Sequence, residues 1–447
     1  MAFVPPFQYF VITGLALAGL LIYYFRGIRQ VPSHALVGVL IYSLFSRFIS
    51  VTYLDYSHSY ITETMNFSRN IGAWKMFLIY MAILLAGVYI SQLVLANRER
   101  MRNEPRFVAP SAKMLRLIFY IVISILGVHY FNIALTGKVA LPGSDVNDWN
   151  FWTKYAVLKF LPSIFGEQVF FVAMLTGSLL YWARFLKDRP LSRVAITTIF
   201  VYMIYLILTG QRFNGLTFPL CILFGMLFAY SRETTGQATP LRLVLAGLSV
   251  LLLMIGYLVY QMQFRGIAQL YGGGSGALLY RLFVLQGHAF WNMYDMVVTH
   301  GRSGNPADIM DGLYVTMRTI APPKLAEAYI AEGVNFANIV FGPAIYMLGT
   351  FGGGVLIFLL GLAYGASCFY IYRAIRHGKL LLLVPLSLLW FTVHSAYASG
   401  SMNQFFSMKA IGATVVLLVL VMADRRARLS ARKREANLRG IGADALF

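Results

Sequence analysis

The sequence predicts an all-α fold, a polytopic bundle of about eleven transmembrane helices with a large helical loop on one side. Three observations predict it. Hydrophobic residues make up 59% of the 447 residues and charged residues only 12%, against the roughly one quarter that a soluble domain needs to cover its surface. The apolar residues gather in long runs, most of them near the roughly 20 residues that a helix needs to cross a bilayer. Lysine and arginine gather in alternate connections between these runs, as in polytopic membrane proteins.

Each apolar run defines one expected span. In chain order the spans lie near Phe7–Phe25, Pro32–Ser50, Ala73–Ala96, Met114–Leu135, Phe165–Phe185, Ala195–Gly210, Leu216–Tyr230, Leu243–Met262, Gly354–Tyr372, Leu380–Ser399 and Ser407–Ala423. The expected organisation is an N-terminal transmembrane bundle of about eight helices at 1–262, a large outer loop at 263–353, C-terminal transmembrane helices at 354–424 and a basic tail at 425–447.

The positive charges set the expected orientation. Lysine and arginine number 37 against 17 acidic residues, a formal net charge of +20. If Arg26 and Arg29 face the cytoplasm, every second connection is basic and most of the 37 cations fall on that side. The positive-inside rule then places the N-terminus outside and the C-terminus inside. We interpret the basic tail as an orientation signal that also contacts anionic membrane lipids, so nucleic acid is not an expected partner.

Two arginines beside outer ends of spans are the first candidate site residues. Arg212 lies in the turn Gly210–Gly215 between two expected spans of only about 15 residues each, too short for the full bilayer, which predicts a turn recessed below the outer surface. Arg265 follows the span that ends near Met262. A cation at this depth needs a cavity, a partner or an anionic ligand, although a side chain that extends its charge to the interface gives the same pattern.

The stretch Ala277–His300 is expected to form an amphipathic helix in the outer loop. Its polar residues include Arg281, His288, Asn292 and Asp295. Their spacing of seven, four and three residues places them on one narrow stripe. A helix that lies on the membrane with this stripe toward water explains the pattern as well. Cation, imidazole and carboxylate on one face also suit an anionic substrate, with His288 as general base.

The end of the loop adds polar candidates. With Arg281, the candidate substrate-binding residues are Arg318, Lys324, Asn335 and Asn338. The segment 339–349 that follows is too short to span and is expected to enter the membrane and return, which is tolerated beside protein or a water-filled cavity. Ordinary close packing of helices is the other use for the glycines around it.

Motifs of other chemistries are missing from the sequence. It has no GxxxxGK[ST] phosphate loop, no HExxH and no cysteine–histidine cluster, so neither a metal nor a cofactor is expected. Asp55 is one lone candidate for a general base or a metal ligand. Acids are scarce within the spans, which argues against a transporter driven by protons or sodium. Arginine binds phosphate through two parallel hydrogen bonds and stays charged, so a lipid-linked diphosphate presented from the outer leaflet is the expected ligand.

The layout resembles the Wzy-type O-antigen polymerases of Gram-negative bacteria. The shared features are the number of spans, the Gly-x-Arg turn ending at Arg212, the second arginine at Arg265 and a long loop that returns through Phe341–Gly354. Arg265 and Gly276 also match a pattern of an arginine, ten residues and a glycine. The resemblance is one of architecture and extends over most of residues 50–424.

This resemblance implies a GT-C-like membrane glycosyltransferase architecture in a bacterial inner membrane. The implied activity is transfer of a growing glycan from undecaprenyl diphosphate to a lipid-linked repeat unit at the periplasmic face. Its implied partners are the repeat-unit flippase and a chain-length regulator, and the implied catalytic set is His288, Arg212 and Arg265. An O-antigen ligase-like transferase has the same chemistry with another acceptor. A polysaccharide or lipid flippase, or another transporter, is the alternative from a different class, although we see no two similar halves of the kind many transporters carry.

Overall fold

The computed structural model describes residues 6–57, 64, 71–101, 107–137, 139, 168–208, 213–236, 241–263, 273–331, 336 and 338–444. All regular structure within these residues is helical. Nine of the described helices are long and apolar enough to cross a membrane, which confirms the predicted multi-pass, all-helical class.

A helix lies at every expected span. The long elements are α1 (Phe7–Gln30), η1 with α2 (Pro32–Val37 and Gly38–Tyr56), α3 (Ala73–Met101), α4 (Ala112–Thr136), α7 (Gln168–Phe185), α8 (Arg189–Leu208), α9 (Phe213–Thr235), α10 (Leu241–Gln263), α16 (Phe341–Arg376), η5 with α17 (Leu380–Leu382 and Leu383–Ser399) and α18 (Met408–Asp444). Local chemistry sets several ends. At α4, the Ser111 side chain accepts a hydrogen bond from the Met114 amide, and Gly137 takes the left-handed conformation that stops the helix.

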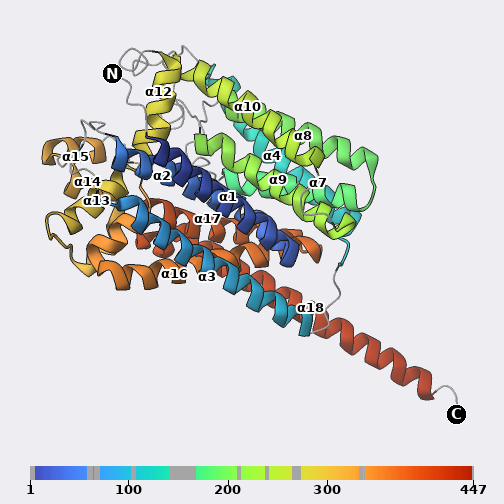
Figure 1. The fold of residues 1–447 in the computed structure, drawn as a ribbon. Coiled ribbons are helices and arrows are strands. Elements are labelled where there is room, and N and C mark those ends of the chain that lie inside the picture. Colours follow the sequence, from blue (N-terminus) through green and yellow to red (C-terminus); the bar gives the residue numbers. More distant parts are fainter. Residues whose placement is uncertain are drawn as a thin grey trace.

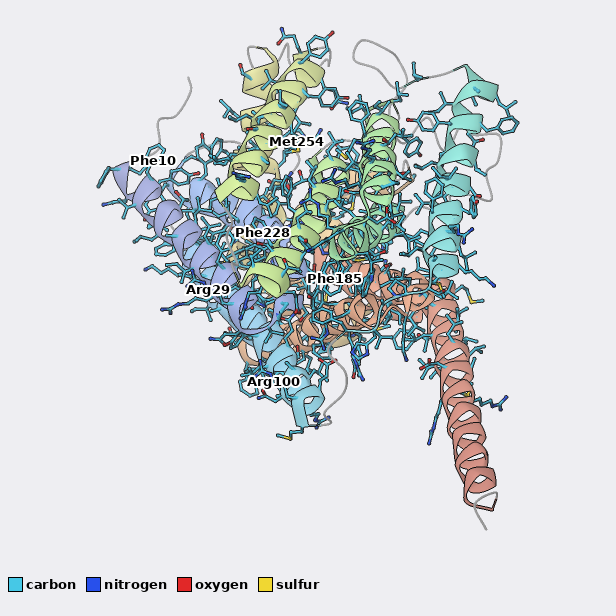
Figure 2. All side chains as sticks on the ribbon, turned by 90° about the vertical axis from the view of Figure 1, so that its right-hand side faces the viewer. Phe10, Arg29, Arg100, Phe185, Phe228 and Met254 are labelled. Carbon is cyan, nitrogen blue, oxygen red and sulfur yellow. The ribbon has the colours of Figure 1, made fainter. Side chains whose placement is uncertain are left out.

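Short helices gather at one end of this bundle. They are α12 (Gly274–Tyr280), the π-helical turn η3 (Arg281–Leu285), α13 (His288–Val298), η4 (Pro306–Asp311), α14 (Gly312–Ile320), α15 (Pro323–Ala331) and η6 (Met402–Phe406). We call this the loop end; the start of α1 lies toward it, and α18 runs away from it (Figure 1). The opposite, basic end holds the ends of α1, α3, α9 and α16. Figure 2 shows Arg29 and Arg100 below Phe10, which lies near the start of α1.

Glycines bring α3 and α16 into close contact along the centre of the bundle. A Cβ on Gly361 would lie 2.3 Å from the Leu84 carbonyl oxygen, and one on Gly87 would lie 2.5 Å from the Phe358 carbonyl oxygen. Gly365, one turn beyond Gly361, would meet Val88. Since neither helix can add a methyl group there, small residues fix this packing, as is usual for helix pairs in membranes.

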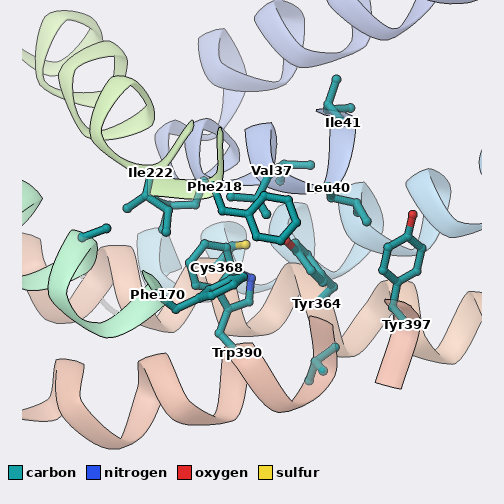
Figure 3. Close-up of a cluster of buried hydrophobic side chains, with 14 of the residues drawn as sticks. Val37, Leu40, Ile41, Phe170, Phe218, Ile222, Tyr364, Cys368, Trp390 and Tyr397 are labelled. Atoms are coloured by element: carbon teal, nitrogen blue, oxygen red, sulfur yellow. The ribbon is translucent and has the colours of Figure 1, made fainter. Parts of the chain in front are cut away.

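An aromatic core lies beside this pair. Phe170, Phe218, Tyr364 and Trp390 come from four different helices and pack together around Cys368 (Figure 3). The Phe170 and Trp390 ring centroids are 4.8 Å apart in an edge-to-face arrangement. The core lets α7 sit inside the bundle although its apolar part is shorter than a full span.

One expectation about helix length is wrong. The helices α8 and α9 contain 20 and 23 residues instead of about 15, because each continues into polar residues at the basic end. The argument that short helices recess the turn at Arg212 therefore fails. The segment 339–349 leads into and forms the first part of α16, which consists of two helical pieces joined by a kink at Gly349 (φ 69°, ψ −179°). A Cβ on Gly353 would lie 3.0 Å from the Ala344 carbonyl oxygen, so the chain folds back at this kink, as the expected return requires. The expected loop boundary at 353/354 lies shortly after the kink, inside α16.

Candidate functional site

A buried arginine lies in the loop-end half of the bundle. Arg47 of α2 is 4% exposed and stands nine residues before the helix ends at Tyr56, which puts it about 14 Å along the helix from that end at 1.5 Å per residue. Its Nε donates to the Asn338 carbonyl oxygen at 3.0 Å, and Nη1 donates to the Ser43 carbonyl oxygen at 3.1 Å and to the Ser43 hydroxyl. Within the described residues Arg47 pairs with no carboxylate, and Nη2 has no acceptor.

The segment before α16 closes around this guanidinium. The Asn338 side chain is 2% exposed, and its Nδ2 donates to the Ser399 carbonyl oxygen at 2.9 Å and to the Thr316 hydroxyl at 3.4 Å. Its Oδ1 is buried and has no hydrogen-bond donor within the part of the chain that the structure describes. Asn338 thus links α14, α17 and Arg47, and its Oδ1 remains available as a hydrogen-bond acceptor.

Helix α17 supplies an aromatic wall. His394 and Tyr397 are 3% and 1% exposed, their ring centroids are 5.7 Å apart, and both lie near Arg47. The His394 ring also packs against Phe170 and Phe218. His394 Nδ1 is buried and has no hydrogen-bond partner among the described residues. We call Arg47, Ser43, Asn338, His394 and Tyr397 the Arg47 centre.

The polar stripe of Ala277–His300 faces the protein, so the interpretation of a surface helix with this stripe toward water is wrong. His288, Asn292 and Asp295 of α13 are 1%, 1% and 0% exposed, and Arg281 is half-buried one element earlier in η3. The expected single helix is also interrupted by η3 and by Gly287, which packs against the α2 backbone at Val51.

His288 is held in one tautomer. Its Nδ1 lies 2.8 Å from the Leu285 carbonyl oxygen, which can only accept, so Nδ1 carries the proton and Nε2 presents its lone pair. Nε2 is buried without a partner among the described residues. Burial lowers the pKa of His288 from 6.5 to about 4, partly offset by the Leu285 hydrogen bond. At neutral pH the imidazole is therefore a neutral hydrogen-bond acceptor.

Asp295 adds a buried carboxylate to the same face. In the described part of the chain neither of its oxygens accepts a hydrogen bond, and His300 Nε2 lies 3.7 Å from Oδ2. Asn292 also has an unsatisfied acceptor. Its Nδ2 donates to the His288 carbonyl oxygen, but its Oδ1 has no donor among the described residues. Buried polar atoms are nearly always satisfied in folded proteins, so these unsatisfied atoms on one helix face are potential partners for water or a ligand.

The α13 face and the Arg47 centre belong to one packed region. Ser50, one turn after Arg47, donates to the Val284 carbonyl oxygen at 2.9 Å and accepts from the Gly287 amide at 2.8 Å. On the other side, the His288 ring lies 5.2 Å from that of Phe336, two residues before Asn338. Helix α2 and the segment before α16 therefore hold both groups at the loop end.

The Asp55 carboxylate holds three helices together. Its Oδ1 accepts from Trp291 Nε1 and its Oδ2 from the Trp74 amide, both at 2.9 Å. This carboxylate ties α2 to α3 and α13. Within the described residues no group of three or more histidine, cysteine or acidic side chains could hold a metal ion.

The other predicted residues are spread out. Arg318 is 55% exposed and pairs with Glu327 at 2.8 Å, and Lys324 is exposed on α15. Arg212, Arg265 and Asn335 lie outside the described residues. Of the candidate substrate-binding residues, Asn338 is therefore the one placed in the Arg47 centre.

Sequence reasoning missed Arg47. It lies inside an expected span, where one charge hardly changes the average hydropathy of a long apolar run. The available signal was the charge itself, since an ionisable residue within a span indicates a functional site unless it has a partner. Ser43 and Ser50, one turn to either side, mark the same polar face.

Comparison with known proteins gives one match. A model for a family of unknown function (DUF6418) matches residues 306–413, which include Asn338, His394 and Tyr397 of the Arg47 centre but neither Arg47 nor His288. No curated protein and no solved structure matches the chain.

Proposed function

We propose that this multi-pass membrane protein is a glycosyltransferase that uses a lipid-diphosphate-linked oligosaccharide. In the reaction we favour, the growing glycan moves from undecaprenyl diphosphate to a lipid-linked repeat unit, as in the Wzy-type polymerases that the sequence resembles. The observation that carries the proposal is Arg47, a buried cation with an open Nη2 and no carboxylate partner among the described residues. Such a cation at membrane depth needs an anion, and a diphosphate supplies oxygens that can accept from Nη2.

The chemistry requires no external energy source. An acceptor hydroxyl oxygen bonds to the anomeric carbon of the donor glycan, and the bond from that carbon to the diphosphate oxygen breaks. The diphosphate leaves with the bonding electron pair, and arginines stabilise its charge. We assign that role to Arg47 together with Arg212 and Arg265.

His288 is the proposed acceptor of the hydroxyl proton. Its Nε2 lone pair is the atom that would receive it, and a diphosphate nearby would raise the pKa of the imidazole by favouring its charged form. Asn338 Oδ1 and Asn292 Oδ1 are available to hold sugar hydroxyls. Both roles depend on substrate entering the region between α2, α13 and α17.

The test is a gel of surface polysaccharide from a deletion strain that is complemented with variants. We expect the deletion to leave one repeat unit on the lipid core, and the wild-type gene to restore long chains. Arg212→Ala and Arg265→Ala should each fail to restore them at normal protein level. Arg302→Ala is the matched control, because Arg302 is an exposed loop-end arginine with no proposed role.

Other gel results point to other functions. A lipid core without any repeat unit would indicate a ligase, and loss of repeat units from the outer leaflet would indicate a transporter. If the deletion strain keeps normal long chains, the proposed function is wrong. If only Arg212→Ala and Arg265→Ala keep them, the diphosphate role of those two arginines is wrong.

A further inference from the structure

A cavity of about 530 Å³ lies at the basic end, far from the Arg47 centre. It is formed where α1, α3, α9 and α16 end. Its charged lining residues are Arg100, Arg232, Arg373 and Arg376 with Glu99 and Glu233. The volume falls in the usual range for small-molecule sites, roughly 300–1,000 Å³.

The two carboxylates hold one side of the cavity together. Glu99 Oε1 lies 2.8 Å from Arg376 Nη2, 3.2 Å from His377 Nε2 and 3.4 Å from Arg373 Nε. Glu233 Oε1 accepts from the Tyr372 hydroxyl at 2.9 Å and lies 3.9 Å from Arg376 Nη1. These acids therefore pair with the arginines of α16.

Several guanidinium nitrogens at the cavity are not paired with these acids. Arg232 donates Nε and Nη2 to a neutral group, the Arg29 carbonyl oxygen, at 3.2 and 3.0 Å. Arg100 is exposed at the end of α3. Arg376 Nε is buried and has no hydrogen-bond partner within the described residues. Among the described lining residues four guanidinium groups face two carboxylates, an excess of positive charge, and Arg376 Nε is an unused donor there.

We propose that this cavity binds a phosphate group, either that of an anionic phospholipid or that of a soluble phosphate compound. Guanidinium groups from several helices suit the oxygens of one phosphate, and basic pockets between transmembrane helices are known as headgroup sites. The site is independent of the proposed glycosyl transfer, because it lies at the other end of the bundle and shares no residue with it.

The test measures ligand binding to the purified full-length chain in neutral detergent. Native mass spectrometry compares retention of phosphatidylglycerol with that of phosphatidylcholine, and thermal unfolding is followed with and without inorganic pyrophosphate. The double variant Arg100→Gln/Arg232→Gln removes two cavity arginines whose hydrogen bonds go to no described carboxylate. Its matched control is Arg98→Gln/Arg116→Gln, which removes two exposed arginines outside the cavity lining.

We expect phosphatidylglycerol to be preferred by the wild type and to bind at least tenfold more weakly to the cavity variant. The control should stay within twofold of the wild type. Displacement of the lipid and stabilisation by pyrophosphate would assign the site to soluble phosphate compounds, and lipid binding without a pyrophosphate effect would assign it to a headgroup. Equal weakening in both double variants would overturn the proposal, as would the absence of both a lipid preference and a pyrophosphate effect.

Discussion

The two ends of the bundle differ in whether a buried charged side chain has a partner of opposite charge among the described residues. At the basic end, Glu99 is 11% exposed and is surrounded by Arg373, Arg376 and His377. At the loop end, Arg47 is more deeply buried and bonds only to a serine and to backbone carbonyl groups among the described residues. A paired charge contributes to packing, whereas a buried charge without a counter-ion is costly unless something else neutralises it. The contrast distinguishes charged side chains that stabilise the fold, such as Glu99, from a buried charge that needs a ligand, Arg47.

Arg47→Met gives the largest expected effect, and that effect is on activity. We expect chain formation to fall at least about 100-fold, because a donor to the leaving diphosphate is lost. Thermal unfolding in detergent should shift less than after the loss of an ion pair, since Arg47 bonds to no described carboxylate and methionine fills a similar volume. Gel analysis and unfolding of the same preparation check both parts. A loss of stability as large as that expected from breaking an ion pair would mean that the role of Arg47 is structural.

Glu99→Gln reverses this pattern. It leaves Arg376 and Arg373 without their shared carboxylate, so we expect a loss of roughly 2–3 kcal/mol of stability, somewhat below the cost of breaking a fully buried pair. Glycosyl transfer per folded molecule should stay near that of the wild type. Chemical unfolding monitored by tryptophan fluorescence measures the first quantity. A stable Glu99→Gln variant with reduced transfer would erase the distinction between the two ends.

His288→Gln should show an effect on stability that depends on pH. The pKa of His288 is lowered to about 4 by burial, so between pH 6.5 and about 4 the unfolded state binds a proton that the folded state does not. Its contribution to stability is therefore complete above pH 6.5 and is lost as the pH falls, by up to roughly 3 kcal/mol at pH 4.

The measurement is the difference in unfolding free energy between wild type and His288→Gln at several pH values. We expect this difference to change between pH 6.5 and 4 and to be constant above pH 7. If His288 is also the general base, His288→Gln should lower transfer more than it lowers retention of lipid-linked substrate. Equal loss of both would make its role structural.

Much of the architecture could be predicted from the sequence. A helix lies at each expected span, because a long apolar run in a bilayer must satisfy its backbone internally. The lengths of α8 and α9 could not be read from hydropathy, because a helix continues past the apolar core into polar residues such as Arg189 and Arg232. The direction of 341–348 relative to the rest of α16 depends on the kink at Gly349, which hydropathy does not show.

Less of the candidate site could be predicted. The spacing of His288, Asn292 and Asp295 correctly groups them on one helix face, but periodicity cannot tell a face that meets water from one that meets protein. The contact between Arg47 and Asn338 joins residues 291 positions apart, so only the fold shows it. The prediction also gave similar weight to Arg318 and Asn338, and burial separates them.

The most direct test of the account is binding of undecaprenyl diphosphate to the purified full-length protein. Wild type, Arg47→Met and the exposed-arginine control Arg302→Ala are compared by titration in the same detergent. We predict that Arg47→Met binds at least tenfold more weakly while Arg302→Ala matches the wild type. Equal affinity of Arg47→Met and wild type would contradict the claim that the buried arginine neutralises the diphosphate.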